Sequence, residues 1–295
     1  MELNEYQNKA RATDQRPRRE GDGIVVPLLG IAGEAGALLT EYKKLLRDGP
    51  AYASFPEQVS EELGDILWYV ANLAGKFDLT LDGIAVANLA KTATRWGDRD
   101  SGPAAWTRPH LFDEGFPEAE QFPRQMTAEV SESVEANGLA TVRLTIDGKA
   151  YGDPLSDNST NDDGYRFHDV LHLVHIAMLS WSPTMRRLMK RKRKSQPTID
   201  VAEDGARATI IDEGVVEMVF DYARRHDFLD GVERIDYELL RAVKRRTSSH
   251  EVSVRSVPEW EQAILEAYRI WRPIRAQGGE RFRLDLVERK VELLE

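Results

Sequence analysis

Apolar residues recur at helical spacing through the first hundred positions of the chain. Residues three, four and seven positions apart share one face of a helix. This spacing predicts a short amphipathic segment over 6–13 and three longer helices over about 25–47, 57–77 and 81–96. Asp48-Gly49-Pro50 ends the first long helix, because glycine tolerates left-handed backbone and proline cannot continue a helix. The polar, glycine-containing stretch 97–103 predicts a linker.

The pattern changes after this linker. Residues 141–146 alternate between apolar and polar, which is the two-residue period of a strand. Asn137-Gly138 and Asp147-Gly148 are strong hairpin signals, so we expect a small antiparallel meander of two or three strands. Helical spacing returns at 165 and predicts helices over 165–179, 203–226, 236–246, 258–271 and 284–294.

These elements predict a mainly α fold made of a helical bundle, a small β-meander and a second helical bundle. The expected domains are 1–100, a connector over 101–160 that holds the meander, and 161–295. Acids precede an apolar helical run both at 61–65 and at 212–217. We therefore interpret the C-terminal domain as a candidate divergent second copy of the first.

Composition narrows the function classes. The chain has 295 residues, of which 41% are hydrophobic and 31% charged, as in soluble globular proteins. The net charge of −10 argues against nucleic acid and anionic membranes as partners. Cysteine is absent, which excludes disulfides, thiolate nucleophiles and cysteine-bound zinc. The N-terminus is too polar for a signal peptide and no apolar run approaches the ~20 residues of a membrane span, so a cytoplasmic location is expected.

Carboxylates gather on two neighbouring predicted helices. Glu34 and Glu41 are seven residues apart, and Glu62 and Asp65 are three apart, so each pair shares a helix face. If the helices pack antiparallel, up to four carboxylates converge. Crowded carboxylates raise one another's pKa values, and Mg²⁺, which prefers oxygen ligands and phosphates, relieves that repulsion. The alternative is two helices with solvated acidic faces. Three nearby glycines, each costing about 1 kcal/mol in a helix, favour a site: Gly33, Gly36 and Gly64.

These motifs resemble a known family. The stretches are Gly30-x-x-Gly33-Glu34-x-Gly36, then Glu61-Glu62-Leu63-Gly64-Asp65-Ile66-Leu67-Trp68-Tyr69, Asn88-Leu89-Ala90-Lys91 and Arg95-Trp96. Together they resemble the MazG-type all-α nucleoside triphosphate pyrophosphohydrolases over residues 25–97. That family carries Glu-x-x-Glu followed by Glu-x-x-Asp. The second half matches as Glu62 and Asp65, whereas Ala37 stands where the first half needs its second glutamate. Glu41, one turn beyond Ala37, could supply that carboxylate, and the number of metal ions stays open.

The resemblance implies Mg²⁺-dependent hydrolysis, with Mn²⁺ as a substitute, of a nucleoside or deoxynucleoside triphosphate between its α and β phosphates. It implies metal ligands at Glu34, Glu41, Glu62 and Asp65, and a general base at Glu61 or Glu41. The implied substrate-binding residues are Lys44, Trp68, Asn88, Lys91 and Arg95, although core packing is an equal alternative for Trp68. The family also implies a homodimer or homotetramer. Two other functions remain open: a nucleotide-binding sensor whose site Ala37 disables, and a hydrolase of a modified or signalling nucleotide.

A second group of polar residues lies in the C-terminal half. His168 and His172 are one helical turn apart beside Asp169, and Glu213 and Glu217 follow on a later helix. Histidine with carboxylate suits Mn²⁺, Zn²⁺ or Fe²⁺ better than Mg²⁺. The alternative is a buried hydrogen-bonded His168–Asp169 pair with His172 in the core. The histidine–aspartate pair also resembles the HD phosphohydrolase motif, whose other members are missing. We expect the five side chains to face one another inside a helical bundle.

Basic residues supply two more candidate contacts. The run 186–194 holds seven cations in nine residues, and such runs are usually solvated faces. Beside an acidic groove it could instead hold polyphosphate, so we expect it at the rim of the second group. In the first segment Gln7, Arg11 and Arg19 are candidate nucleotide contacts, with a solvated arm as the alternative.

Overall fold

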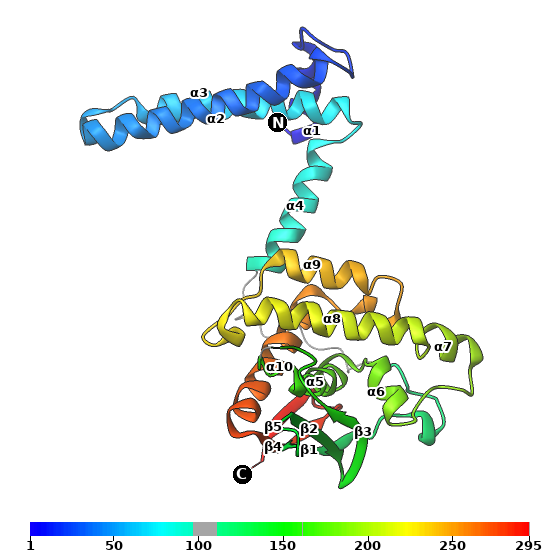
Figure 1. The fold of residues 1–295 in the computed structure, drawn as a ribbon. Helices are drawn as coiled ribbons and strands as arrows, with labels where there is room; N and C mark the ends of the chain where they lie inside the picture. Colours follow the sequence, from blue (N-terminus) through cyan, green and yellow to red (C-terminus); the bar gives the residue numbers. More distant parts are fainter. Residues whose placement is uncertain (97–110, 161, 295) are drawn as a thin grey trace. The chain divides into compact units, whose positions relative to one another are not determined.

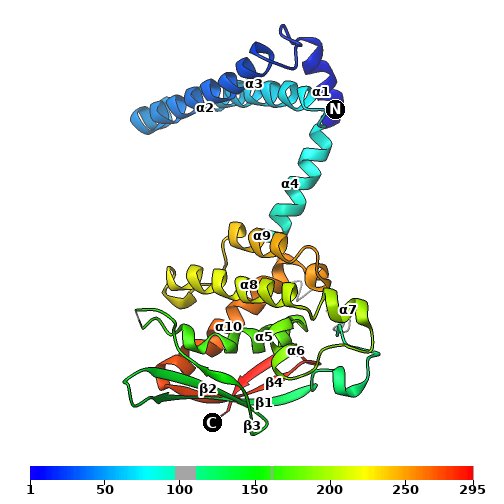
Figure 2. The ribbon, with the colours of Figure 1, turned by 45° about the vertical axis from the view of Figure 1, so that its right-hand side comes forward.

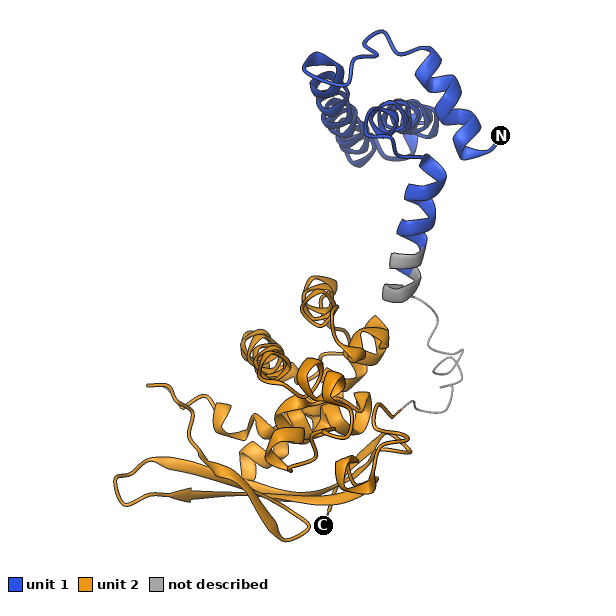
Figure 3. Cartoon of the chain, turned by 90° about the vertical axis from the view of Figure 1, so that its right-hand side faces the viewer, with its two compact units in different colours: residues 1–97 blue, residues 98–295 orange. Residues whose placement is uncertain are grey.

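The computed structural model describes residues 1–96, 111–160 and 162–294, without the side chains of 90, 91 and 93–96. The chain forms two compact units, Met1–Gly97 and Asp98–Glu295 (Figure 3). The regular elements in the described residues of unit 1 are all helices, and unit 2 combines helices with a sheet. The fold is therefore mainly helical with a small antiparallel sheet.

Unit 1 is built on a long helical hairpin. Its α-helices are α1 Leu3–Ala12, α2 Asp22–Asp48, α3 Phe55–Lys76 and α4 Leu81–Trp96, with a short 3₁₀ turn, η1 Gly49–Ala51, after α2. Figures 1 and 2 both show α2 and α3 side by side along their length, with α1 near the far end of α3. Gly49 adopts a φ of +59° at the end of α2, as expected where a helix stops at a glycine. The predicted helices of this unit are confirmed.

The buried core of unit 1 is very small. Among the side chains that the structure describes, it consists of Ala10, Ala71, Ala74 and Leu81, with three partly buried apolar side chains packed against it. Large apolar side chains on α2 and α3 are exposed instead: Val25, Leu28, Leu29, Leu39, Tyr42, Leu46, Leu63 and Leu67. Contiguous exposed apolar surface on a soluble unit usually marks an interaction site.

The segment Asp22–Ala51, which contains α2, is long and apolar enough to cross a membrane by length and composition. The sequence analysis expected no such segment. Core helices of soluble proteins and signal sequences meet the same criterion, so the finding does not place this helix in a membrane.

A five-stranded antiparallel sheet forms the floor of unit 2. Its order is β3-β2-β1-β4-β5, with strands β1 Gln125–Val134, β2 Ala140–Ile146, β3 Lys149–Leu155, β4 Gly279–Asp285 and β5 Lys290–Leu293. On the central strand, Met126, Ala128 and Val130 are buried and alternate with more exposed residues. Val130 pairs with Leu144 on one side and with Glu280 on the other. One face of the sheet therefore packs on the core while the other faces solvent.

Helices cover the apolar face of the sheet in two layers. The α-helices of unit 2 are α5 Asp169–Leu179, α6 Pro183–Leu188, α7 Pro197–Ala202, α8 Ala206–Arg224, α9 Tyr237–Arg246 and α10 Val257–Gln277; the 3₁₀ turns are η3 Glu118–Glu120, η4 Tyr165–Phe167, η5 Asp227–Leu229 and η6 Glu251–Val254. In Figure 2, α5 and α10 lie next to the sheet, and α8 and α9 lie beyond them. Every residue of α5 is buried, so this helix is the centre of the unit. A capping box between Ser256 and Glu259 starts α10.

The sheet corrects three expectations. The predicted meander is present as β1–β3, but β4 and β5 join it from the end of the chain, so 101–160 is not a separate connector. The helix predicted over 284–294 is wrong. Residues 281–286 read Arg-Phe-Arg-Leu-Asp-Leu, and this alternation buries Phe282 and Leu284 on one face of β4 and Leu286 directly after it. The second-copy interpretation finds no support either, since the described residues of unit 1 contain no strand.

The basic run 186–194 is not one solvated face. Arg186 and Arg193 are 2% and 0% exposed. Arg193 donates to both oxygens of Asp204 and Glu251, at 2.7 to 3.1 Å, and Arg186 reaches Asp113 at 3.0 Å. Only the outward members of the run, such as Lys194, are exposed. Two of the seven cations therefore belong to a buried ionic network.

We predict that Arg193→Met lowers the free energy of unfolding of unit 2 by about 3–5 kcal/mol, because it removes the cation that bonds both Asp204 and Glu251 and leaves Asp204 only the Arg186 cation, at 3.7 Å, among the described residues. Denaturant unfolding of the full chain measures this change. The matched control, Lys194→Met, removes a neighbouring exposed charge and should stay within about 0.5 kcal/mol. Equal effects of the two substitutions would contradict the buried network.

Candidate functional site

The helical hairpin of unit 1 brings acids of α2 and α3 together. The carboxyl group of Glu62 on α3 interacts with that of Glu34 on α2. Loss of hydration raises the pKa of Glu62, and the hydrogen bond and charge of Glu34 raise it further. The nearby charges of Glu61 and Glu41 act in the same direction. The predicted convergence of acids from two helices is therefore present at this pair.

Glu41 is 6% exposed and already has partners. One carboxylate oxygen accepts a hydrogen bond from Lys44 Nζ at 2.7 Å, and the other accepts one from the Tyr52 hydroxyl. The Lys44 bond, followed by the Tyr52 bond, lowers the pKa of Glu41 and keeps it ionised. In this arrangement Lys44 pairs with Glu41 and does not stand free as a phosphate contact.

The remaining predicted residues of unit 1 are dispersed. Asp65 and Glu61 are exposed on α3, and Asn88 is exposed on α4. The Trp68 indole donates a hydrogen bond to Thr13 Oγ1 at 2.8 Å and packs edge-on against Tyr69, which agrees with the packing alternative. The side chains of Lys91 and Arg95 lie outside the described residues.

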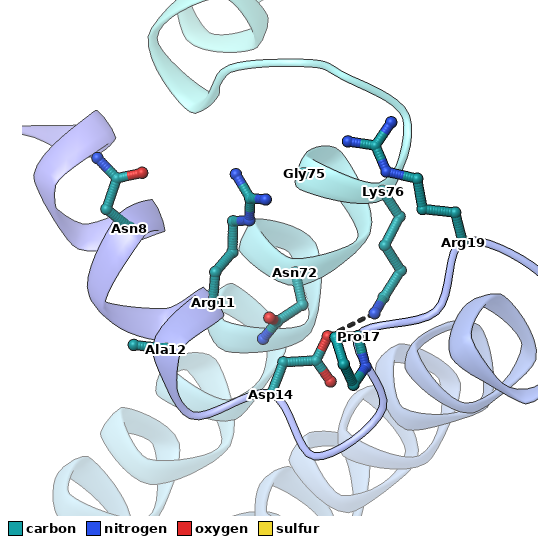
Figure 4. Close-up of a pocket in the computed structure, with 9 residues that line it drawn as sticks. All are labelled: Asn8, Arg11, Ala12, Asp14, Pro17, Arg19, Asn72, Gly75 and Lys76. Carbon is teal, nitrogen blue, oxygen red and sulfur yellow. Dashed lines mark hydrogen bonds and ion pairs between the residues drawn. The ribbon is translucent and has the colours of Figure 1, made fainter.

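A polar pocket opens where α1, the following loop and the end of α3 meet (Figure 4). Its volume is about 260 Å³, and it is lined by Asn8, Arg11, Ala12, Asp14, Pro17, Arg19, Asn72, Gly75 and Lys76. Lys76 is neutralised by Asp14, and Arg19 pairs with Asp78. Arg11 forms no ion pair within 4.0 Å among the described residues, and a Cβ added at Gly75 would lie 2.7 Å from its Cδ.

Asn72 gives this pocket a buried polar group. The side chain is 1% exposed, its amide nitrogen donates to the Trp68 carbonyl at 2.9 Å, and its Oδ1 has no partner in the described part of the chain. Asn72 lies ten residues after Glu62, about 15 Å along α3 at 1.5 Å per residue. Of the candidate contacts in the first segment, Arg11 and Arg19 line the pocket. Gln7 instead hydrogen-bonds the backbone carbonyl of Leu79 and the backbone amide of Leu81, and so holds α1 against the start of α4.

In unit 2, four of the five predicted residues converge. The candidate ligand atoms of His168, Asp169 and His172 all lie within 4.8 Å of one another. Glu213 Oε2, from α8, lies 3.4 Å from His172 Nε2 and 4.0 Å from His168 Nε2. Glu217 stays exposed and interacts electrostatically with Tyr165, so it is not part of this cluster. We expected the basic run 186–194 at the rim of this cluster. Among the described residues, no hydrogen bond or ion pair joins the run to His168, Asp169, His172 or Glu213.

The sequence analysis missed Asp212, which anchors the cluster. It is fully buried, and its Oδ1 lies 3.1 Å from His172 Nδ1. Its Oδ2 accepts hydrogen bonds from the Ser182 hydroxyl at 2.7 Å and the Thr184 amide at 3.1 Å. Two features of the sequence could have indicated it. Asp212 is an acid within an apolar helical run, directly before Glu213, and a Ser-Pro helix start lies 30 residues earlier.

Burial and the neighbouring charges act against each other in the cluster. Burial by itself lowers the pKa of His172, but the charges and hydrogen bonds of Asp212 and Glu213 outweigh it and raise that pKa well above its usual value. Burial raises the pKa of Asp169 in spite of the two histidines. Three carboxylates in this interior need a positive charge among them, as a proton on imidazole or as a bound cation.

In the comparisons with known proteins, a family model matches residues that lie in unit 2. Residues 107–295 match the model of the MazG C-terminal domain. The "Gene 37 protein" of Mycobacterium phage L5 is 37% identical over 76 residues, which are 25% of this chain and 67% of that protein. No solved structure matches significantly. The matched range excludes 25–97, where the sequence analysis placed its resemblance, and spans about two thirds of the chain. The chain therefore belongs to the MazG C-terminal domain family.

Proposed function

We propose that this protein is a nucleoside triphosphate pyrophosphohydrolase whose active site lies in unit 1. The observation that carries the proposal is the approach of Glu34 and Glu62 across the α2–α3 hairpin. The matched family is described as the C-terminal domain of MazG, and in this chain unit 1 precedes that domain. The motifs of unit 1 resemble the MazG catalytic signature, which supports the same assignment.

The acids of unit 1 suit a Mg²⁺ ion. Glu34 and Glu62 lie together, and Asp65 follows Glu62 by three residues on the exposed side of α3. These oxygens would hold Mg²⁺, which when bound neutralises phosphate charge and lowers the pKa of a water. Glu61, exposed beside them, would take the proton of the attacking water. Glu41 would hold Lys44 in place near the departing pyrophosphate.

The pocket at the end of α3 suits the base and sugar of the nucleotide. Asn8 and Asn72 offer amide groups that can hydrogen-bond the edge of a base, and Arg11 offers a planar guanidinium on which a base can stack. Its place about 15 Å along α3 from Glu62 separates these contacts from the phosphates.

One observation favours a nucleotide sensor as a second candidate. Ala37 stands at the place of a signature glutamate, and Lys44 and Tyr52 occupy both oxygens of Glu41. Only three acids then remain for the metal. A sensor would bind the nucleotide without releasing pyrophosphate, so one assay separates the two functions.

The assay incubates the full chain with ribo- and deoxyribonucleoside triphosphates, and with modified nucleotides, in Mg²⁺ or Mn²⁺. We expect release of pyrophosphate and formation of the monophosphate, identified by mass spectrometry. Binding without turnover would favour the sensor. Release of orthophosphate in place of pyrophosphate would contradict cleavage between the α and β phosphates.

We predict that Asp65→Asn and Glu62→Gln each abolish pyrophosphate release without unfolding unit 1, because each removes a charged oxygen from the metal site. Circular dichroism checks the fold, and initial rates at saturating Mg²⁺ measure activity. Glu57→Gln, an exposed acid in the first turn of the same helix, is the matched control and should retain full activity. Full activity of Asp65→Asn would remove the proposed site.

We predict that Glu41→Gln lowers turnover by about 10²-fold, the scale of a key electrostatic or general-base group. If Glu41 instead supplies the carboxylate missing at position 37, Ala37→Glu in the same chain should restore part of the activity. Tyr52→Phe is the control, since it removes one hydrogen bond to Glu41 and keeps the charge. A loss below about threefold in Glu41→Gln would mean that catalysis needs neither the charge of Glu41 nor its contact with Lys44.

We further propose that unit 1 associates with a second copy of itself. The core formed by its described side chains has four residues, which is too small for a stable unit of this length, and apolar side chains are exposed on both α2 and α3. Two such hairpins can pack as a four-helix bundle with self-complementary faces.

We predict that the chain is a dimer or tetramer by light scattering and that Leu39→Glu converts it to monomers, because Leu39 is 67% exposed on α2. The control is Val201→Glu on α7 of unit 2, which is 74% exposed and should not alter the mass. A monomeric wild-type chain would refute the association.

A further inference from the structure

We propose that His168, Asp169, His172 and Glu213 form a second cation site, in unit 2, that takes a divalent transition metal. This site is separate from the acids of unit 1 and does not depend on the function proposed for them.

Both histidines are oriented by their Nδ1 atoms. His168 Nδ1 lies 2.8 Å from the carbonyl oxygen of Tyr165, so Nδ1 carries the hydrogen and Nε2 keeps its lone pair. His172 Nδ1 lies 3.1 Å from Asp212, whose other oxygen is held by Ser182 and Thr184. Metal-binding histidines commonly donate their second nitrogen to a carbonyl or carboxylate in this manner.

The acid from α8 is oriented in the same way. Thr184 Oγ1 donates to Glu213 Oε1 at 3.2 Å, which leaves Oε2 directed at the two histidines. Thr184 thus contacts both Asp212, through its amide, and Glu213, through its hydroxyl. The start of α6 therefore fixes the two carboxylates of α8 against α5.

The spacing of the free atoms matches one shared ion. Ligands at about 2.1 Å from a tetrahedral metal lie about 3.4 Å apart. The separations are 3.4 Å for His172 Nε2 to Glu213 Oε2, 3.9 Å for His168 Nε2 to Asp169 Oδ1 and 4.0 Å for His168 Nε2 to Glu213 Oε2. These three separations exceed the tetrahedral spacing by at most about 0.6 Å, and the ligand atoms of His168, Asp169 and His172 all lie within 4.8 Å of one another.

A hydrogen-bonded pair explains the same atoms less well. A charge-assisted bond from imidazolium to carboxylate is usually about 2.7–2.9 Å long. His172 Nε2 and Glu213 Oε2 are 3.4 Å apart, and His168 Nε2 has no carboxylate oxygen nearer than 3.9 Å in the described part of the chain.

Asp169 is the independent observation. The residue is 8% exposed and its side chain 12% exposed, and no hydrogen-bond donor contacts its carboxylate among the described residues. Among the described residues, the side-chain nitrogen nearest to it is His168 Nε2, at 3.9 Å. Burying a carboxylate without a hydrogen bond is unfavourable. A cation held jointly with the histidines would compensate that charge.

The donor set selects the class of metal. Two imidazole nitrogens and two carboxylate oxygens suit Mn²⁺, Fe²⁺ or Zn²⁺ better than Mg²⁺ or Ca²⁺, which prefer oxygen alone. The side chain of Glu213 is 38% exposed whereas that of His172 is fully buried, so solvent reaches the site from the α8 side.

The test measures binding of Mn²⁺ and of Zn²⁺ to the full chain by equilibrium dialysis and elemental analysis, after removal of metal with a chelator. Four proteins are compared with the wild type: His168→Gln, Glu213→Gln, Glu62→Gln and Glu217→Gln. Glu62→Gln removes the acid pair of unit 1. Glu217→Gln is the matched control, an exposed acid one turn beyond Glu213 on α8. Circular dichroism and a melting curve report whether each variant folds.

We expect His168→Gln and Glu213→Gln each to weaken the binding of one metal equivalent at least tenfold, while Glu62→Gln and Glu217→Gln retain it. The metal should also raise the melting temperature of the wild type and of Glu62→Gln, but not that of His168→Gln. Unchanged metal binding in His168→Gln and Glu213→Gln would overturn the proposal. It would also be overturned if Glu62→Gln lost the metal equivalent assigned to unit 2 while His168→Gln and Glu213→Gln retained it. Failure of catalysis in unit 1 would leave these results untouched.

Discussion

The fully buried contact between His172 and Asp212 holds unit 2 together. Both side chains have no exposed surface, and they join the central helix α5 to α8. An isolated charge in such an interior would be strongly unfavourable, so each group requires the other. Ser182 and Thr184 then bind the far oxygen of Asp212, which positions α6 as well. Three helices thereby meet at one carboxylate.

The contact between His172 and Asp212 also orients the candidate metal ligands. Once Asp212 fixes the His172 ring, Nε2 can face only the space between α5 and α8, where His168, Asp169 and Glu213 lie. A site held by rigid, buried helices keeps its geometry better than one carried by loops. Unit 1 has the opposite character. Its acids lie on an exposed hairpin with a four-residue core, so their geometry depends on what covers the apolar faces of α2 and α3.

Sequence reasoning succeeded where the signal was local. Helical spacing located α2, α3 and α4, and one-turn spacing found the histidine pair. It failed where partners are distant in sequence. Arg193 is neutralised by Glu251, 58 residues away, and nothing near the basic run indicates this burial. The strand β4 pairs with β1, which lies more than 140 residues earlier in the sequence. The helix predicted over 284–294 overlaps residues 281–286, so their alternation was not recognised as a strand.

The central claim is that each unit holds its own cation centre, one of oxygen ligands and one of mixed nitrogen and oxygen ligands. Anomalous scattering from Mn²⁺ in crystals of the full chain grown with a non-hydrolysable nucleoside triphosphate tests it most directly. The account predicts one peak within about 2.2 Å of carboxylate oxygens of Glu34 and Glu62, and a second at similar distances from the His168 and His172 Nε2 atoms. Absence of the peak at either pair under saturating Mn²⁺ would contradict the claim for that unit.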